Sequence, residues 1–238
     1  MRGLLVMTLF AVSLSHATWR DFKDVRELEV DASSVTSLRI DAGAGALEVK
    51  GVEGADRIFV TATIEIENTK DEEAHELMER YLLLSLAIEG DQARLDAGFE
   101  RGIWPNRHNA RVNLEVQVPE SLALVVEDSS GSIRIADMIA PVKVDDSSGS
   151  IDVFGSGDLD IEDGSGSIDV EGVAGDLRID DGSGSINVRN VKGSVYIDDG
   201  SGSISVRHVD RDLVVTNAGS GSLSYANVGG VVEGDIED

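Results

Sequence analysis

The chain has 238 residues, with 45 acidic against 20 basic side chains and a formal net charge of −25 at neutral pH. Nucleic acid and anionic membrane surfaces are disfavoured as partners, because both are polyanions that would repel such a chain. Cysteine is absent, which excludes disulfides, thiol catalysis and cysteine-based zinc sites. Metal cations and basic partners stay compatible with this composition.

The first 17 residues match a secretory signal peptide. Residues 1–2 are a short basic region, residues 3–14 are apolar, and residues 15–17 (Ser-His-Ala) fit a cleavage site. The apolar run is too short to span a bilayer, and no later stretch is long and apolar enough to do so. The sequence predicts export to the periplasm or beyond, with no membrane insertion of the mature chain; a buried N-terminal helix is the alternative.

The region from 18 to 121 mixes strands with one expected helix. Alternating apolar residues predict short strands at 28–30 and 38–40, and a β-branched run predicts a long strand over 57–67. Thr69 and Glu72 match a capping box that would start a helix over 70–83. The remaining expected elements are a hairpin of 84–89 with 93–97, a loop over 98–110 and a strand over 111–118.

A phrase of the type Leu-Arg-Ile-Asp-Asp-Gly-Ser-Gly-Ser-Ile-Asn-Val, found at 177–188, recurs along the rest of the chain. The glycine before its second apolar triplet repeats at steps of 17 to 19 residues. The anchor positions are Gly131, Gly149, Gly166, Gly184, Gly202 and Gly221, with an earlier copy at Gly45. A fixed period with two short strand patterns per unit is typical of a solenoid.

Each repeat places apolar residues on one face of two short strands, so the Gly-Ser-Gly between them must turn a corner. One repeat cannot bury enough surface to fold alone, and stacked repeats share an interior. The sequence therefore predicts an all-β chain, a single-stranded parallel β-solenoid, or β-helix, expected to be right-handed. The expected organisation is a signal peptide (1–17), an N-terminal β region with the first rung and a helix-containing insertion (18–121), and a continuous regular solenoid (122–238).

This layout resembles the putative-adhesin domain family of exported bacterial proteins. The resemblance covers about 35–232 and rests on an Ala-Gly-x-Gly rung at 42–45, a strand ending in Val118-Pro119, and the runs of Gly-Ser-Ile/Leu-x-Val. It implies a β-solenoid of the bacterial envelope with no known molecular function, and it brings no catalytic residues.

The corners carry pairs of acids that stacking would place in columns about 4.8 Å apart. Carboxylates at that distance repel one another, and a hard cation such as Ca²⁺ could bridge them. The alternative is that the acids point to water and cap the corners as Asx-turns. The candidate metal ligands are Asp145, Asp146, Asp163, Asp180, Asp181, Asp198 and Asp199.

The expected loop over 98–110 is the densest aromatic and cationic cluster of this acidic chain. Its candidate ligand contacts are Phe99, Arg101, Trp104 and Arg107. Rings and guanidinium groups can contact a sugar or a peptide; the alternative is a loop that folds back over the helix or a coil end.

These features favour a non-catalytic, adhesin-like binding or structural module whose partner is an envelope or extracellular protein or glycan. The four histidines lack metal-ligand spacing, and the corner serines lack a base partner. Two alternatives stay open, namely a polysaccharide-active enzyme on a parallel β-helix and a calcium-responsive adhesin.

Overall fold

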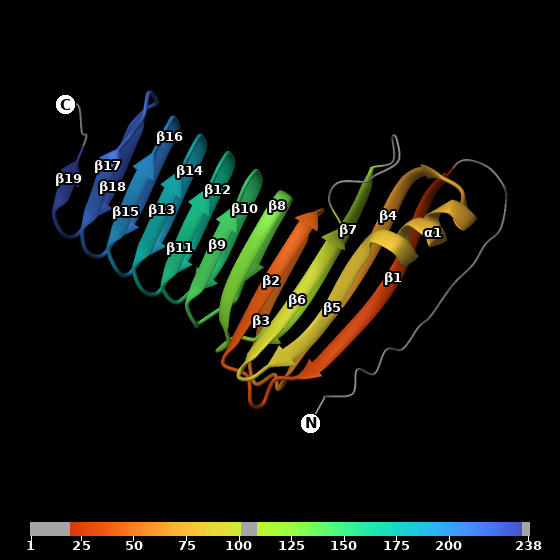
Figure 1. Ribbon diagram of the computed structural model, residues 1–238. Coiled ribbons are helices and arrows are strands. Elements are labelled where there is room, and N and C mark those ends of the chain that lie inside the picture. Colours follow the sequence, from red (N-terminus) through yellow and green to blue (C-terminus); the bar gives the residue numbers. More distant parts are fainter. Residues whose placement is uncertain (1–19, 101–108, 235–238) are drawn as a thin grey trace.

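The computed structural model describes residues 20–100 and 109–234, which form nineteen strands and one helix. The strands build two long sheets that face each other across a narrow apolar interior (Figure 1). Each coil contributes one strand to sheet A and one to sheet B, and equivalent residues of successive coils stack in register. The predicted parallel β-solenoid is thereby confirmed.

The regular coils begin at β8 (Ala123–Ala136), a long strand that turns the corner and contributes to both sheets. Sheet A continues with β10 (Gly149–Ser156), β12 (Gly166–Val173), β14 (Gly184–Val191), β16 (Gly202–Val209) and β18 (Leu223–Val228). Sheet B continues with β9 (Val142–Asp146), β11 (Leu159–Asp163), β13 (Leu177–Asp181), β15 (Val195–Asp199), β17 (Leu213–Asn217) and β19 (Val232–Gly234).

The N-terminal part extends the same two sheets in the other direction. The predicted first rung, β2 (Ser37–Ala44) and β3 (Leu47–Val52), lies parallel to β8. Its other neighbours are β6 (Gln92–Phe99) and β7 (Ala110–Pro119), also parallel. Antiparallel strands complete this end: β1 (Arg20–Asp31) and β4 (Arg57–Thr69) in sheet A, and β5 (Leu82–Glu89) in sheet B.

Two local expectations differ from the structure. The strands β6 and β7 were expected in an insertion, yet they form a further coil on the far side of β2 and β3. The helix α1 (Asp71–Tyr81) begins one residue later than expected, and its N-cap residue, Lys70, makes no side-chain capping hydrogen bond. The Thr69 hydroxyl instead donates to the Lys70 carbonyl at 3.4 Å, so the predicted capping box does not form.

Close stacking of the corners explains their glycines. Gly184 has φ +150°, and a Cβ added to it would collide with the backbone carbonyl oxygen of Gly166 one coil away. Other residues rarely adopt this backbone conformation, and here there is also no space for a side chain. The interior beside the corner is aliphatic, with residues such as Ile179 and Ile186 fully buried.

Candidate functional site

The two acids of each corner point in opposite directions. Asp180 is exposed on the outer face of sheet B, whereas Asp181 points into the coil with 2% of its surface exposed. The same division holds along the stack. The inward acids, called the inner column below, are Asp128, Asp146, Asp163, Asp181 and Asp199. The outward acids are Glu127, Asp145, Glu162, Asp180 and Asp198, and the register places each beside its equivalents in adjacent coils. The candidate metal ligands therefore belong to two separate rows.

Four of the inner-column carboxylates, those of Asp146, Asp163, Asp181 and Asp199, each cap their own corner. Asp181 Oδ1 accepts a hydrogen bond from the Ser183 N–H at 3.0 Å, and Asp199 Oδ1 accepts one from Ser201 at 2.9 Å. These bonds are the Asx-turns that the sequence offered as an alternative to metal binding. The Oδ2 atoms of Asp146, Asp163, Asp181 and Asp199 are closed off from water and have no hydrogen-bond partner among the described residues.

Burial disfavours the ionised form of the inner-column carboxyl groups. Loss of water raises the pKa of Asp128 to about 7, with repulsion from Asp146 adding to the effect. Burial likewise raises the pKa of Asp163 to about 6, and it raises the pKa values of Asp146, Asp181 and Asp199. The neutral acid avoids the cost of desolvating a carboxylate.

The geometry offers little to a metal ion. Within 20–100 and 109–234, no group of three or more His, Asp or Glu side chains is arranged to hold one. The backbone carbonyls of Asp163 and Asp181 already accept hydrogen bonds from Gly182 and Gly200, at 2.9 and 2.8 Å. Calcium binding by the corner acids stays a prediction, and it would depend on carboxylates from adjacent coils.

The candidate ligand loop lies largely outside the described residues, which include none of Arg101, Trp104 and Arg107. Phe99 is described. It ends β6 and is half-buried against the apolar core. The role of this loop in ligand contact stays a prediction.

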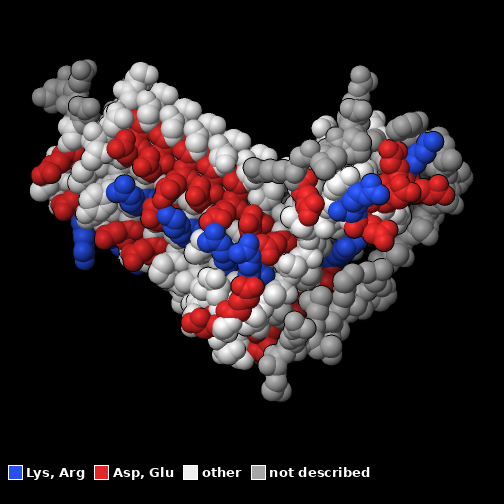
Figure 2. All heavy atoms as spheres, viewed as in Figure 1, with Lys and Arg blue, Asp and Glu red and all other residues white. Residues whose placement is uncertain are grey.

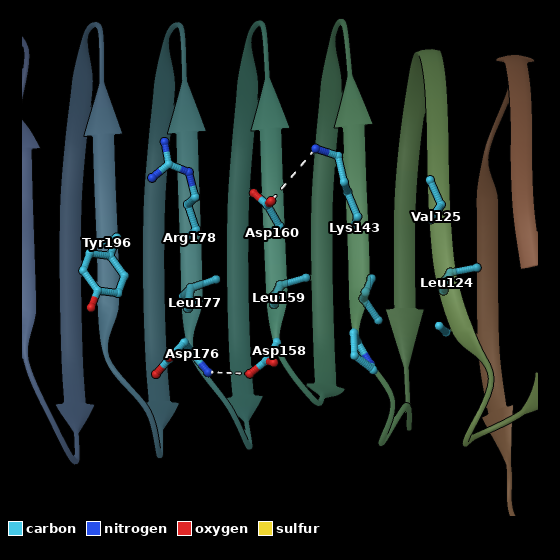
Figure 3. Close-up of a pocket in the computed structure, with 13 residues that line it drawn as sticks. Leu124, Val125, Lys143, Asp158, Leu159, Asp160, Asp176, Leu177, Arg178 and Tyr196 are labelled. Carbon is cyan, nitrogen blue, oxygen red and sulfur yellow. Dashed lines mark hydrogen bonds and ion pairs between the residues drawn. The ribbon is translucent and has the colours of Figure 1, made fainter. Parts of the chain in front are cut away.

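The described residues also form a groove of about 530 Å³ on the outer face of sheet B, across β8, β9, β11, β13 and β15 (Figure 3). One outward row of side chains runs along it, with each residue beside its equivalent in the next strand. In order, this row is Val125, Lys143, Asp160, Arg178 and Tyr196. Val125 lies at one end of the groove, and Tyr196 and Arg178 stand on neighbouring strands at the other. Pro141 also lines the groove.

Several polar groups of this groove are not satisfied within the described part of the protein. Arg178 forms neither an ion pair within 4 Å nor a hydrogen bond there. Asp160 Oδ1 is closed off from water without a hydrogen-bond partner, although Oδ2 of the same side chain lies 3.9 Å from Lys143 Nζ. The Tyr196 side chain is uncovered, with 41% of the residue exposed. The groove therefore combines an aromatic ring, a free guanidinium group and a carboxylate oxygen without a partner.

Elsewhere on this face, cations are already paired with acids. Arg39 contacts Glu127, and Arg94 lies 2.7 Å from Asp96. Figure 2 shows basic and acidic side chains side by side across the molecule. Lys143 lies 2.6 Å from Glu162, and the hydrogen bond to that acid raises the lysine pKa. Arg178 thus stands beside an exposed ring without an ion pair within 4 Å among the described residues, and at longer range its charge contributes to the lowered pKa of Glu162.

The groove was not predicted from the sequence. Its depth depends on which residues of five strands lie side by side, which a single repeat does not reveal. The available signal was the presence of Val125 and Tyr196 at positions occupied by charged residues in neighbouring repeats.

No protein-family profile matches the chain, and no curated protein matches it. Solved structures do resemble it. A structure described as a putative adhesin from Bacteroides fragilis is 12% identical with a TM-score of 0.42, over 89% of this chain and 97% of that one. A putative lipid binding protein from Parabacteroides distasonis is 15% identical with a TM-score of 0.41, over 90% and 95%. A putative cell adhesion protein from Clostridium sporogenes is 11% identical with a TM-score of 0.32, over 90% and 99%.

Structures described as putative adhesins are thus among those that resemble this chain, in agreement with the family resemblance of the sequence. At these identities and TM-scores, the likeness carries no argument about a ligand. The residues of this chain must therefore support any function assigned to it. Among the described residues, no helix has the length and apolar character needed to cross a membrane.

Proposed function

We propose that the protein is a non-catalytic binding module of the bacterial cell envelope, and that its sheet B groove holds an uncharged segment of an envelope glycan. The observation that carries this proposal is the juxtaposition in one groove of exposed Tyr196 and of Arg178, which has no ion pair within 4 Å among the described residues. The envelope location rests on the predicted signal peptide and on the family resemblance of the sequence.

The chemistry of the groove suits a sugar. A pyranose offers a face of C–H groups to an aromatic ring and hydroxyls to flanking polar groups. Tyr196 supplies such a ring. Arg178 donates hydrogen bonds, and the Asp160 carboxylate, whose side chain is 42% exposed, accepts them through Oδ2. Ligand sites commonly combine apolar lining with a few convergent polar groups of this kind. A polyanionic glycan fits less well, because the net charge of −25 would repel it.

The polar groups around the groove favour binding over catalysis. Asp158 Oδ1 accepts the Asp176 N–H at 2.9 Å, and Asp176 Oδ1 accepts the Ser194 N–H at 2.8 Å. These carboxylates therefore hold the next coil in place, and no histidine lines the groove. An acid and base pair acting on a glycosidic bond would need carboxyl groups free to exchange protons with substrate.

Calorimetric titration with neutral and acidic envelope polysaccharides tests the proposal. Tyr196→Ala and Arg178→Ala should each weaken binding of a neutral glycan about tenfold or more, whereas Tyr196→Phe should retain most of the affinity because the ring remains. Arg207→Ala is the matched control, since Arg207 is an exposed arginine on β16 of the opposite sheet.

Wild-type affinity in both alanine variants would exclude this groove as the glycan site. Analysis of the incubated polysaccharides for new reducing ends or unsaturated products separates binding from catalysis. Their appearance at a rate proportional to protein concentration would replace the proposal with the enzyme alternative.

A further inference from the structure

The C-terminal coil leaves the apolar interior of the solenoid open. Strands β18 and β19 each pair with one neighbour only, and no described element covers their other edges (Figure 1). Tyr225 occupies the inward position that Val206 fills one coil earlier, yet it is 44% exposed whereas Val206 is fully buried. Val231 is 57% exposed at the same end.

This open coil has lost the charges that mark the rest of the protein. Residues 213–232 contain no charged side chain, although a stretch of that length would carry about five at the chain's charged fraction of 27%. The preceding corner has Asp198 and Asp199, while the last corner has Thr216 and Asn217. Asn217 Oδ1 still accepts a hydrogen bond, from the Gly219 N–H at 3.0 Å, so the turn is kept and only the charge is removed.

At the opposite end of the molecule, charged side chains protect the edge strand from pairing with another chain. Edge strand β1 carries Lys23, Asp24, Arg26, Glu27 and Glu29, and charged side chains on an exposed edge oppose pairing with another chain. The C-terminal edge strands β18 and β19 carry a single charge, Glu233, and so have little such protection. The difference between the two ends indicates that the C-terminal edge is meant to be covered.

The charge distribution of the chain also limits which molecule can cover the C-terminal edge. Residues 200–232 are neutral overall, with Arg207 and Arg211 against Asp210 and Asp212, in a chain of net charge −25. Two copies of this protein repel each other over most of their surfaces and meet least repulsion here. A two-fold axis would place each uncharged edge against its own copy, where antiparallel strands can exchange backbone hydrogen bonds.

We propose that the last coil is the interface of a symmetric homodimer, in which β18 and β19 pair with the same strands of a second copy. Tyr225 of β18 and Val232 of β19, which aligns with buried Leu213, then cover the open interior of the other copy, and both sheets continue through the interface. Glu233, exposed on β19, is a described charge that the dimer brings close to its symmetry mate. Added salt should therefore strengthen the association by screening this repulsion.

Sedimentation of the full chain over a wide concentration range measures the association. We expect a monomer–dimer equilibrium that tightens with salt. Tyr225→Lys should weaken dimerisation about tenfold or more, because it places a charge at the centre of the edge. Leu83→Lys is the matched control: Leu83 is 46% exposed on β5 at the other end, and its substitution should leave the dimer intact.

Cross-linking tests the geometry, since the natural chain has no cysteine. A short bismaleimide should join two copies of Ala226→Cys, an exposed site on β18, and fail with Val25→Cys on β1.

A chain that stays monomeric at all concentrations overturns the proposal, even if it takes up another protein at this end. A dimer that is dissociated by Leu83→Lys but not by Tyr225→Lys also overturns the proposal. Glycan binding by Tyr225→Lys should match wild type, because the groove lies away from the last coil, so the two proposals fail separately.

Discussion

The inward corner position is filled differently in the two regions of the molecule. The register aligns Ala97 of β6 and Ala42 of β2 with Asp128 of β8, and every coil from there to β15 places an aspartate at this position. The N-terminal region thus turns the same corner with a small apolar side chain. An acid is not needed to fill the space.

The two regions differ in the side chain that close stacking of the corners buries. Close stacking of identical corners provides continuous hydrogen-bond ladders, but it also stacks whatever side chain the repeat contains. In the regular coils this is a buried carboxylate with an oxygen lacking a partner. In the N-terminal region, Ala42 and Ala97 avoid that penalty. The regular region should therefore be more sensitive to corner substitutions and to pH than the N-terminal region.

The largest effect should come from a corner glycine. Gly184→Ala forces a Cβ against the Gly166 carbonyl and should lower the free energy of unfolding by at least about 3 kcal/mol. Gly54→Ala, at a turn of the N-terminal region with φ +69° and open space around the missing Cβ, should cost only about 1–2 kcal/mol, from the backbone conformation alone. Denaturant unfolding of both variants measures the difference. Equal losses would contradict the close stacking of corners.

The next effect is a stability that rises as the pH falls. The folded-state pKa values of the inner column lie above the usual 3.8, at about 7 for Asp128 and about 6 for Asp163. Between about pH 4 and 7 the folded chain therefore binds more protons than the unfolded chain, so its free energy of unfolding increases on acidification. The two-unit shift of Asp163 alone corresponds to about 3 kcal/mol.

Urea unfolding at pH 8 and pH 5 measures this gain. Glu162, whose pKa is lowered by its hydrogen bond from Lys143, stays ionised across that window and does not obscure it. Asp163→Asn keeps the turn bond and removes the charge, so it should stabilise the protein at pH 8 and reduce the gain at pH 5. Asp152→Asn, on the outer face of sheet A, is the control and should leave the pH dependence unchanged, because the Asp152 charge shifts none of the inner-column pKa values. A protein less stable at pH 5 than at pH 8 would contradict the protonated column.

These features differ in how far the sequence could predict them. The coils followed from the spacing of Gly166, Gly184 and Gly202, because glycine is required where corners touch. The inward direction of Asp181 could also be predicted from the sequence, since Asp181 lies two positions after the buried Ile179 and strand side chains alternate. The coil formed by β6 and β7 could not be predicted, because a long segment without the Gly-Ser-Gly corner separates its two strands in the sequence. The groove depends on side chains from five strands, which no single repeat contains.

The smallest effect concerns calcium. If Ca²⁺ binds the corner acids, the outward row is the accessible one, because Asp145, Asp180 and the other outward carboxylates face solvent while the inner column is closed. An exposed row of this kind should bind weakly, so we expect millimolar Ca²⁺ to raise the melting temperature by about one or two degrees relative to chelator. Mg²⁺ at the same ionic strength controls for simple screening.

Substitution locates the ion. Asp180→Asn should abolish the calcium-dependent rise, whereas Asp41→Asn, on the outward row of the N-terminal region beside Arg94, should preserve it. A melting temperature identical in Ca²⁺, Mg²⁺ and chelator would rule out the calcium-responsive alternative. A rise that survives Asp180→Asn and disappears in Asp163→Asn would place the ion in the inner column. It would show that a cation, in place of a proton, can neutralise the stacked carboxylates that the N-terminal region avoids with Ala42 and Ala97.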